Sequence, residues 1–204
     1  MHEEALKHLG RADDVLGKLI HRVGPCDIKA TPRRSPFQAL VQSVAHQQLN
    51  GKAAATILGR VKGLFPGKVF PTPQDLMDMP EERLRGAGLS RSKIAAIKDI
   101  ARHSLSGKVP DNRSIAKLTD EEILERLTAI RGVGPWTVHM LLMFKLGRLD
   151  VLPATDFGVR KGFSVVYAWE EMPSPAELLE HGERWRPYRS IASWYMWRAL
   201  ELPS

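Results

Sequence analysis

Asp156 is the acidic residue whose place in the sequence best suits catalysis, because it stands at the expected start of a helix after a glycine-rich turn. An ionised carboxylate there can stabilise positive charge on a reacting group or orient an attacking water molecule. Aspartate is also one of the best helix N-caps. The position alone therefore leaves two interpretations, a catalytic group and a simple cap.

The glycine-rich turn lies in residues 127–138, which read Leu-Thr-Ala-Ile-Arg-Gly-Val-Gly-Pro-Trp-Thr-Val. The pattern predicts a helix end, a tight turn and a new helix, because only glycine enters positive φ without steric penalty and proline suits a first helical turn. The unpaired N–H groups of such a helix start can bind a phosphate. An ordinary connection between helices is the alternative, and Gly-x-Gly alone would favour it.

The composition narrows the possible functions. Of the 204 residues, 43% are hydrophobic, which is enough for a real core, and Lys and Arg outnumber Asp and Glu by 30 to 23. The resulting formal charge of +7 suits a polyanionic partner. The single cysteine, Cys26, excludes an internal disulfide framework and a four-cysteine iron–sulfur cluster carried by this chain alone. The scattered histidines show no metal-ligand spacing.

No apolar stretch approaches the length of a membrane span, and the first residues lack the features of a signal peptide. We therefore expect a soluble monomer with no membrane partner. Its expected location is the cytoplasm and nucleoid of a bacterium, or the nucleus of a eukaryote.

Nearly every segment predicts helix, so the expected fold class is all-α. Helical spacing of apolar residues predicts helices across residues 3–22 and 136–146, and only residues 68–71 and 164–167 have strand character. No Asn-Gly or Asp-Gly hairpin signal occurs. Four expected helix starts have an N-cap with its capping partner: Ser35, Thr72, Thr119 and Ser174.

The hairpin pattern Leu127-x-x-Ile130-x-Gly132-Val133-Gly134-x-x-Thr137, its Gly-Pro pair and the downstream Asp156 together resemble the helix-hairpin-helix/Gly-Pro-Asp DNA glycosylases. Residues 185–190 (Trp-Arg-Pro-Tyr-Arg-Ser), with Trp194 and Trp197, are similar to the DNA-3-methyladenine glycosylase II (AlkA-type) branch. Residues 47–49 and 88–93 also fit that branch. The resemblance covers about residues 35–200.

The resemblance implies a bilobal helical protein with its active site between the lobes. Residues 32–147 would form the lobe that contains the hairpin. Residues 1–31 and 148–204 would form the second lobe, which carries the catalytic Asp156. AlkA-type enzymes often have an extra N-terminal β domain, and we expect none in this chain.

Position 136 bears on the reaction type. Superfamily members that also cut the DNA backbone have a lysine there as a Schiff-base nucleophile, whereas this chain has Trp136. The resemblance therefore implies hydrolysis by water to an abasic site without lyase activity, and neither Lys145 nor Lys161 matches the lysine position. No second acid accompanies Asp156, which suits a leaving base that is already cationic. The expected substrate is double-stranded DNA with alkylated purines, such as 3-methyladenine or 7-methylguanine, in base excision repair.

The resemblance also implies a base pocket, formed by Trp136, Trp197, Met140 and Phe157. Electron-rich rings attract cationic bases. Core packing is the alternative for either pocket tryptophan, and we expect it for Trp185 and Trp194. Met140 and Arg198 stand where an AlkA-type enzyme can have tyrosine, and Arg198 could disfavour a cationic base.

DNA contacts are expected from three further segments. Base flipping leaves a gap in the duplex, which a wedge loop must hold open. The hairpin would bind phosphate through Gly132, Val133, Gly134 and Thr137. The wedge loop would consist of Gln48, Leu49 and Asn50, whereas for Gln47 we favour a polar contact between helices. Ser90 and Lys93 would bind further phosphate, with an exposed basic turn as the alternative.

No cofactor is required in this interpretation. The resemblance adds a structural Na⁺ or K⁺ held by the backbone carbonyls of Thr128, Ile130 and Val133. Two other functions stay open at this stage: a glycosylase for deaminated or mismatched bases, and a non-catalytic helix-hairpin-helix module that binds unusual DNA structures. Asp156 and Trp136 argue against the second of these.

Overall fold

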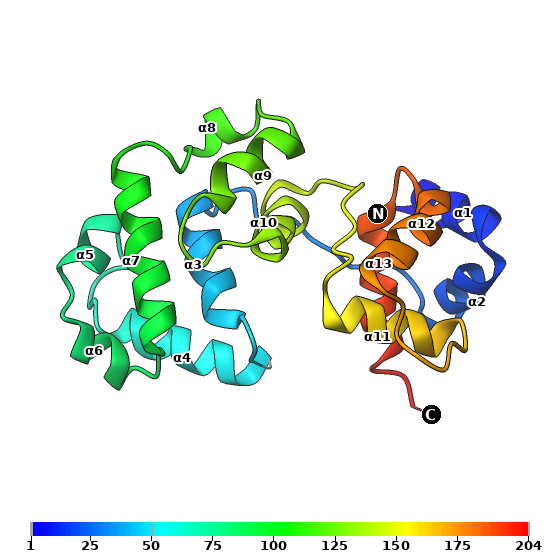
Figure 1. Cartoon of the computed structure of the whole chain (residues 1–204), viewed down its shortest axis with the longest axis horizontal. Helices are drawn as coiled ribbons and strands as arrows, with labels where there is room; N and C mark the ends of the chain where they lie inside the picture. Colours follow the sequence, from blue (N-terminus) through cyan, green and yellow to red (C-terminus); the bar gives the residue numbers. More distant parts are fainter. Residues whose placement is uncertain (1, 50, 204) are drawn as a thin grey trace. The chain divides into compact units, whose positions relative to one another are not determined.

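The structure is a computed structural model that describes residues 2–49 and 51–203, and every regular element within them is helical (Figure 1). The all-α fold class is therefore confirmed. The two segments with predicted strand character form no strand, since residues 68–71 are irregular and residues 164–166 end helix α11. The helices are α1 (Glu3–Ala12), α2 (Asp14–Val23), α3 (Pro36–His46), α4 (Gly51–Gly63), α5 (Pro73–Asp78), α6 (Glu81–Gly86), α7 (Arg91–Leu105), α8 (Asn112–Ile115), α9 (Asp120–Thr128), α10 (Pro135–Leu141), the π-helix η1 (Leu142–Leu146), α11 (Phe157–Val166), α12 (Pro175–Gly182), the 3₁₀-helix η2 (Glu183–Trp185) and α13 (Arg189–Ala199).

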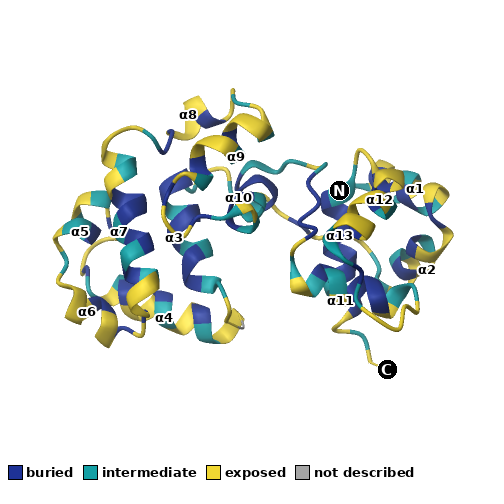
Figure 2. Ribbon diagram, in the orientation of Figure 1, coloured by how far each residue is buried: buried dark blue, intermediate teal, exposed yellow. Residues whose placement is uncertain are grey.

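The chain divides into two compact units. The hairpin unit comprises Thr31–Leu141 and contains α3 to α10, and the aspartate unit comprises Met1–Ala30 with Leu142–Ser204. Each unit has its own core of buried side chains (Figure 2). The sequence analysis placed the second boundary at residue 147. In the structure η1 belongs to the aspartate unit. The expected helix over 136–146 changes from α to π geometry at the same point, after Leu141.

All four expected N-caps form capping boxes. In each, the Ser or Thr side chain accepts from the amide three residues later, and that residue's side chain accepts from the N-cap amide. Each box satisfies two amides that the helix itself leaves unpaired. These helix starts are therefore specified by a few neighbouring residues.

The single helix expected over residues 3–22 is wrong, because it breaks at Asp13 into α1 and α2. Asp13 adopts an extended backbone, with φ −154° and ψ 104°. Its Oδ1 accepts hydrogen bonds of 3.1 Å from the amides of Val15 and Leu16. Aspartate is a strong N-cap and a weak helix former, so the cap prevails over the apolar spacing.

Asp13 is also the centre of a buried polar cluster in the aspartate unit. Its Oδ2 accepts from the Tyr167 hydroxyl at 2.7 Å and the Trp185 Nε1 at 3.1 Å, and it pairs with His181 Nε2 at 3.2 Å. Burial raises the pKa of Asp13, but the hydrogen bonds from His181, Tyr167 and the Leu16 amide together hold that pKa far below its usual value. The cluster joins α2 to the end of α11, to α12 and to η2.

Candidate active site and nucleic-acid interface

Asp156 is the N-cap of α11 and is half-buried. Its Oδ1 accepts a hydrogen bond of 2.7 Å from the Val159 amide and one of 2.8 Å from the indole Nε1–H of Trp197. Two fixed donors hold the carboxylate in one orientation. The cap therefore does not compete with a catalytic role, because capping is part of what orients the group.

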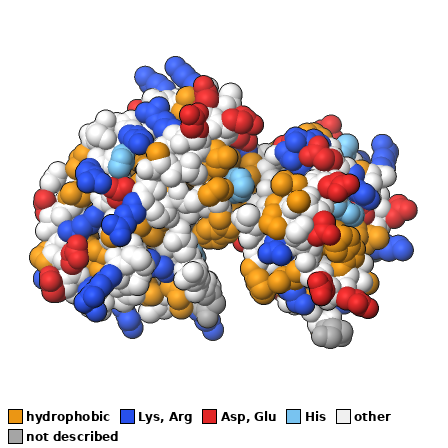
Figure 3. Space-filling model, in the orientation of Figure 1, with side chains coloured by type: hydrophobic (Ala, Val, Ile, Leu, Met, Phe, Trp, Pro, Cys, Tyr) orange, Lys and Arg blue, Asp and Glu red, His pale blue; other side chains and the backbone are white. Residues whose placement is uncertain are grey.

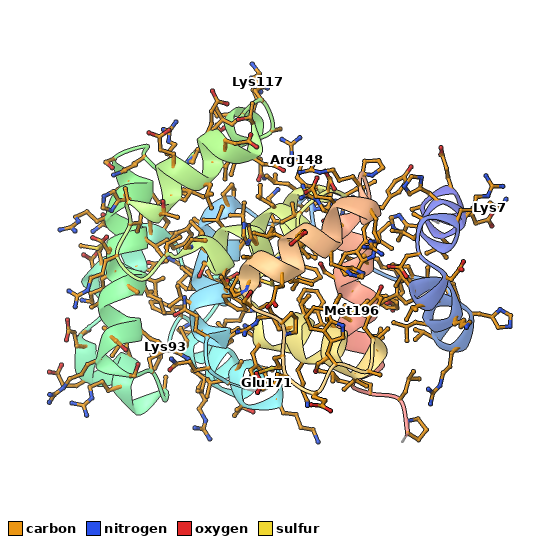
Figure 4. All side chains as sticks on the ribbon, turned by 45° about the vertical axis from the view of Figure 1, so that its right-hand side comes forward. Lys7, Lys93, Lys117, Arg148, Glu171 and Met196 are labelled. Atoms are coloured by element: carbon orange, nitrogen blue, oxygen red, sulfur yellow. The ribbon has the colours of Figure 1, made fainter. Side chains whose placement is uncertain are left out.

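Two glycines one turn apart on α11 allow this contact. A Cβ at Gly158 would lie 2.8 Å from Cδ1 of Trp197 and 3.1 Å from Oδ1 of Asp156, and a Cβ at Gly162 would lie 2.0 Å from the Met196 carbonyl oxygen. Helices α11 and α13 thus pack backbone against backbone, with Met196 on α13 (Figure 4). The sequence analysis missed both glycines, although their Gly-x-x-x-Gly spacing directly after Asp156 was a usable signal.

Phe144 lies beside Trp197, with ring centroids 5.9 Å apart and ring planes 30° from parallel. It is supplied by the π-helix η1, and π-helical turns occur frequently at functional sites. No sequence pattern singled out Phe144. Trp197 therefore contacts both the carboxylate and a second ring, and its predicted stacking on a base stays a prediction.

The segment that leads to Asp156 is clamped by the start of α13. Ser190 Oγ donates to the Arg148 carbonyl at 2.8 Å and accepts from the Val151 amide at 2.9 Å. Arg189 binds both carboxylate oxygens of Asp150, at 2.7 and 3.1 Å. The Arg-Ser part of the motif recognised in the sequence thus fixes the backbone shortly before Asp156.

The hairpin uses its two glycines differently. Gly132 has a positive φ of 76°, and a Cβ there would lie 2.4 Å from Cβ of Ala96. Gly134 does not have a positive φ, and a Cβ there would meet nothing within 4 Å. The fold therefore requires glycine at 132 but not at 134. The Val133 amide donates to the Ile130 carbonyl at 3.0 Å, so the turn itself already uses that N–H.

Asp99 of α7 anchors the hairpin turn through a hydrogen bond to its backbone. Its Oδ2 accepts a hydrogen bond of 2.8 Å from the Arg131 amide, while its Oδ1 pairs with Arg102. Burial raises the pKa of Asp99, but the hydrogen bonds from the Arg131 amide and from Arg102 lower that pKa by more, so the net shift is downward. An ionised carboxylate therefore anchors the turn that was predicted to bind DNA.

Gln47 ends α3 and makes the contact between helices that we expected. Its Nε2 donates to the Gly132 carbonyl at 3.0 Å and to the Thr137 hydroxyl at 2.9 Å. Thr137 is only 1% exposed, so its side chain supports the hairpin from inside. The place of Thr137 in a DNA-binding hairpin stays a prediction, and it would depend on the backbone because the side chain is buried.

The wedge loop begins at the surface. Gln48 is exposed and has a left-handed backbone, with φ 57°, and Leu49 is 38% exposed. Asn50 lies outside the described residues. The wedge role stays a prediction, and exposure of the first two residues is compatible with it.

The basic turn before α7 is partly used inside the unit. Ser90 caps α7 by accepting from the Lys93 amide at 3.3 Å. The Lys93 ammonium donates to the Ala45 carbonyl at 2.9 Å, and burial lowers its pKa. Phosphate binding by Ser90 and Lys93 stays a prediction, with one of the three lysine donors already occupied.

The remaining pocket candidates occupy two elements. Trp136 and Met140 lie one turn apart on α10 and are half-buried, and Phe157 at the start of α11 is 67% exposed. A shared base pocket stays a prediction. Trp185 and Trp194 are 0% and 8% exposed, which confirms that they pack in the core.

Two general expectations can be compared with the described residues. No helix among residues 2–49 and 51–203 is both long and apolar enough to cross a membrane. The same residues contain no group of three or more His, Cys, Asp or Glu placed to bind a metal ion. Lys145 is buried at 4% exposure, although most lysine side chains in proteins are solvated.

Comparison with known proteins places these features in context. The sequence profile of the HhH-GPD superfamily base excision DNA repair proteins matches residues 41–187. DNA-3-methyladenine glycosylase 1 of Schizosaccharomyces pombe is 38% identical over 196 residues, covering 96% of this chain and 86% of the relative. The structure of S. pombe 3-methyladenine DNA glycosylase (Mag1) in complex with abasic DNA has a TM-score of 0.92 at 38% identity, covering 98% and 97% of the two chains. The crystal structure of Bacillus halodurans DNA-3-methyladenine glycosidase has a TM-score of 0.80 at 37% identity, covering 96% and 88%.

Proposed function

We propose a DNA glycosylase function for this chain, which belongs to the HhH-GPD superfamily of base excision DNA repair proteins. The enzyme flips an alkylated purine out of double-stranded DNA and hydrolyses its N-glycosidic bond, leaving an abasic site. The observation that carries this proposal is the oriented carboxylate of Asp156, in a chain similar over nearly its whole length to named 3-methyladenine glycosylases.

Asp156 acts on the sugar in this mechanism. As the C1′–N bond breaks, its electron pair leaves with the base and positive charge develops on the deoxyribose, where a fixed carboxylate stabilises it. A water molecule then forms the C1′–O bond and releases its proton to the solvent, and Asp156 can orient that water. The Val159 amide and the Trp197 indole keep the carboxylate in place throughout.

The absence of a second acid among the matched positions supports a cationic substrate. A 3-methyladenine or 7-methylguanine base carries positive charge while bound to the sugar, so it leaves as a neutral molecule and needs no general acid. Arg198 raised an objection to such a base. Its Nη1 pairs with Glu201 at 2.7 Å and its guanidinium lies 5.3 Å from the Trp194 ring centroid, so its charge is compensated locally.

Trp136 supports hydrolysis without strand cleavage. It stands in the first turn of α10, at the matched position where lyase members of the superfamily have a lysine. An indole cannot form a Schiff base with the opened sugar. We therefore infer a monofunctional glycosylase.

DNA binding is assigned to the backbone of the hairpin. The open space at Gly134 supports close approach of a phosphate to the start of α10. The carbonyls of Thr128, Ile130 and Val133 suit a hard monovalent cation, since they lie at or just after the C-terminal end of α9 and a carbonyl has two lone pairs. The Val133 amide occupies one lone pair of Ile130 and leaves the second for Na⁺ or K⁺. Such an ion would stiffen the turn.

The direct test is to incubate the pure protein with methylated duplex DNA and identify any released base by chromatography. We expect 3-methyladenine and 7-methylguanine, together with abasic sites that break only after alkali. Parallel incubations use duplexes that contain hypoxanthine or a mismatch, and release from those duplexes alone would support the deaminated-base alternative. Binding with no release from any damaged duplex would support the non-catalytic module.

A further inference from the structure

Gln47 connects the two segments of the hairpin unit that the proposed function brings to DNA. Both of its donated hydrogen bonds end on the hairpin side, one at the Gly132 carbonyl and one at the Thr137 hydroxyl. Its own amide is taken up by the last turn of α3, at the carbonyls of Ser43 and Val44. The residue is thus fixed at both its backbone and its side chain.

Residues 48 and 49 follow Gln47 directly and lie at the surface. The chain leaves α3 at Gln47 with φ −50° and ψ 130°, and Gln48 then takes the left-handed conformation. A non-glycine residue in that conformation persists only when its surroundings enforce it. The anchored Gln47 side chain is such a constraint, because it holds the residue immediately before the strained one.

A second tie reaches the same turn from α7. The Lys93 ammonium, labelled at the start of α7 in Figure 4, donates to the Ala45 carbonyl at 2.9 Å. The end of α3 is therefore held by α7 through Lys93 and by the hairpin through Gln47. A turn that served only to connect α3 with α4 would not require its last helical residues to be held from two other elements.

We propose that Gln47 is a positioning residue that makes the hairpin move as one body with Gln48 and Leu49. When the hairpin amides bind a phosphate, the two hydrogen bonds of the Gln47 side chain set the distance and direction at which residues 48 and 49 reach the duplex. Binding of the hairpin to the DNA backbone would thereby promote unstacking of the neighbouring base pair. This inference rests on the proposed function only in taking DNA as the ligand, and it does not require excision.

The amide of Gln47 is suited to this task because both of its N–H groups are used on different partners. Alanine at this position removes both bonds and leaves the hairpin's own turn intact, since the Val133–Ile130 bond and the Asp99–Arg131 bond do not involve Gln47. Phosphate binding should therefore survive while the wedge loses its placement. Glutamate should be worse than alanine, because it directs an oxygen at the carbonyl of Gly132.

The experiment measures two affinities for each variant, one for an intact duplex and one for a duplex with a stable abasic-site analogue opposite 2-aminopurine. Fluorescence of 2-aminopurine reports unstacking at the gap. We expect Gln47→Ala to bind the intact duplex within twofold of the wild type, and to lose about tenfold of its preference for the abasic duplex together with the fluorescence increase. Gln74→Ala is the matched control, because the side-chain amide of Gln74 donates to Asp78, an exposed residue one helical turn away.

Equal weakening on both duplexes would overturn the inference, because Gln47 would then merely stabilise the hairpin. An unchanged preference in a folded Gln47→Ala would overturn it as well. If thermal unfolding shows that Gln47→Ala does not fold, Thr137→Val removes one of the same two bonds isosterically and should lower the preference in the same direction. Where Gln47→Ala does fold, the double variant Gln47→Ala/Thr137→Val should lose no more of the preference than Gln47→Ala alone.

Failure of the proposed function would be distinguishable from failure of this inference. A wild-type protein that releases no base from methylated DNA would refute the glycosylase proposal. The two affinities would still be measurable in that case. Their ratio in Gln47→Ala would still decide whether Gln47 couples phosphate binding by the hairpin to unstacking of the duplex.

Discussion

The two units of the chain carry their charge and hold their functional groups differently. Between residues 31 and 141, Lys and Arg outnumber Asp and Glu by 17 to 10, whereas the remaining residues contain 13 of each. The whole net charge of +7 therefore belongs to the hairpin unit, whose visible face carries many Lys and Arg side chains (Figure 3). Excess positive charge gives affinity for a polyanion without selecting a chemical step.

The aspartate unit has no excess charge and places one carboxylate accurately. Its functional group is the Asp156 side chain, which hydrogen-bond donors hold in place. The hairpin unit instead presents backbone amides, and a phosphate can approach them closely because Gly134 has no side chain. A buried, ionised aspartate underlies both arrangements: Asp13 joins the helices around α11, and Asp99 holds the Arg131 amide. The comparison suggests a division of work, in which one unit grips DNA and the other performs chemistry.

The largest effect should come from Asp156→Asn. The amide keeps the size and the Oδ1 acceptor for Val159 and Trp197 but removes the charge, so we expect single-turnover excision to slow by at least about 100-fold. Binding to abasic and intact duplexes should stay within twofold. Full excision by this variant would refute the role of the carboxylate.

Asp13→Asn should have the next largest effect, and this effect should be on the free energy of unfolding only. An amide NH₂ would face the donors that now point at Oδ2, so we expect a loss of about 2 kcal/mol in urea unfolding at pH 7. Because the folded pKa of Asp13 is lowered, its contribution is present above about pH 4, the unfolded value, and is lost as pH falls toward the native one. The difference between wild type and variant should therefore shrink in acid. Asp14→Asn, an exposed neighbour, is the control.

Trp197 distinguishes two ways in which the aspartate unit could act. Trp197→Phe keeps a ring but removes the N–H that binds Asp156, so excision of every substrate should fall by about tenfold. Trp197→Ala also removes the ring, and should cost more for 3-methyladenine and 7-methylguanine than for neutral hypoxanthine. A uniform loss with a lowered melting temperature would indicate core packing instead.

Gly134→Ala tests the hairpin unit with a smaller effect. A methyl group has room there in the free protein, so the melting temperature should not change. It would obstruct a phosphate, and binding to damaged and undamaged duplexes should weaken alike by about fivefold. Gly59→Ala on α4, which also meets nothing within 4 Å, is the matched control. Weakening confined to damaged DNA would mean that the hairpin reads the lesion.

The last prediction is that no covalent protein–DNA adduct forms during turnover. Borohydride added during turnover should trap no protein–DNA adduct, because Trp136 cannot serve as an amine nucleophile. A trapped adduct would direct attention to the aspartate unit, where burial lowers the pKa of Lys145 and so favours the neutral amine. Loss of the adduct in Lys145→Met would then identify the nucleophile.

Features set by neighbours in the chain were predictable from the sequence. The four capping boxes, the sharp turn at Gly132 and the N-cap at Asp156 each depend on residues within one helical turn, so the local pattern contained the information. The break at Asp13 is also local, and it was missed because apolar spacing was given more weight than a strong N-cap. The net charge and the position of Trp136 required only the order of residues.

Tertiary structure decided what Asp156 and Gln47 touch. The bond from Trp197 to Asp156 joins positions 41 residues apart, and those from Gln47 join positions 85 and 90 residues apart. Such contacts depend on how closely whole helices pack, as at Gly162, where α11 meets the backbone of α13. Periodicity and capping specify which face a helix buries, but not its neighbour or their separation, because many packings can bury the same face. The sequence by itself therefore identified the carboxylate and the hairpin, and only the folded chain could assign the donors that orient them.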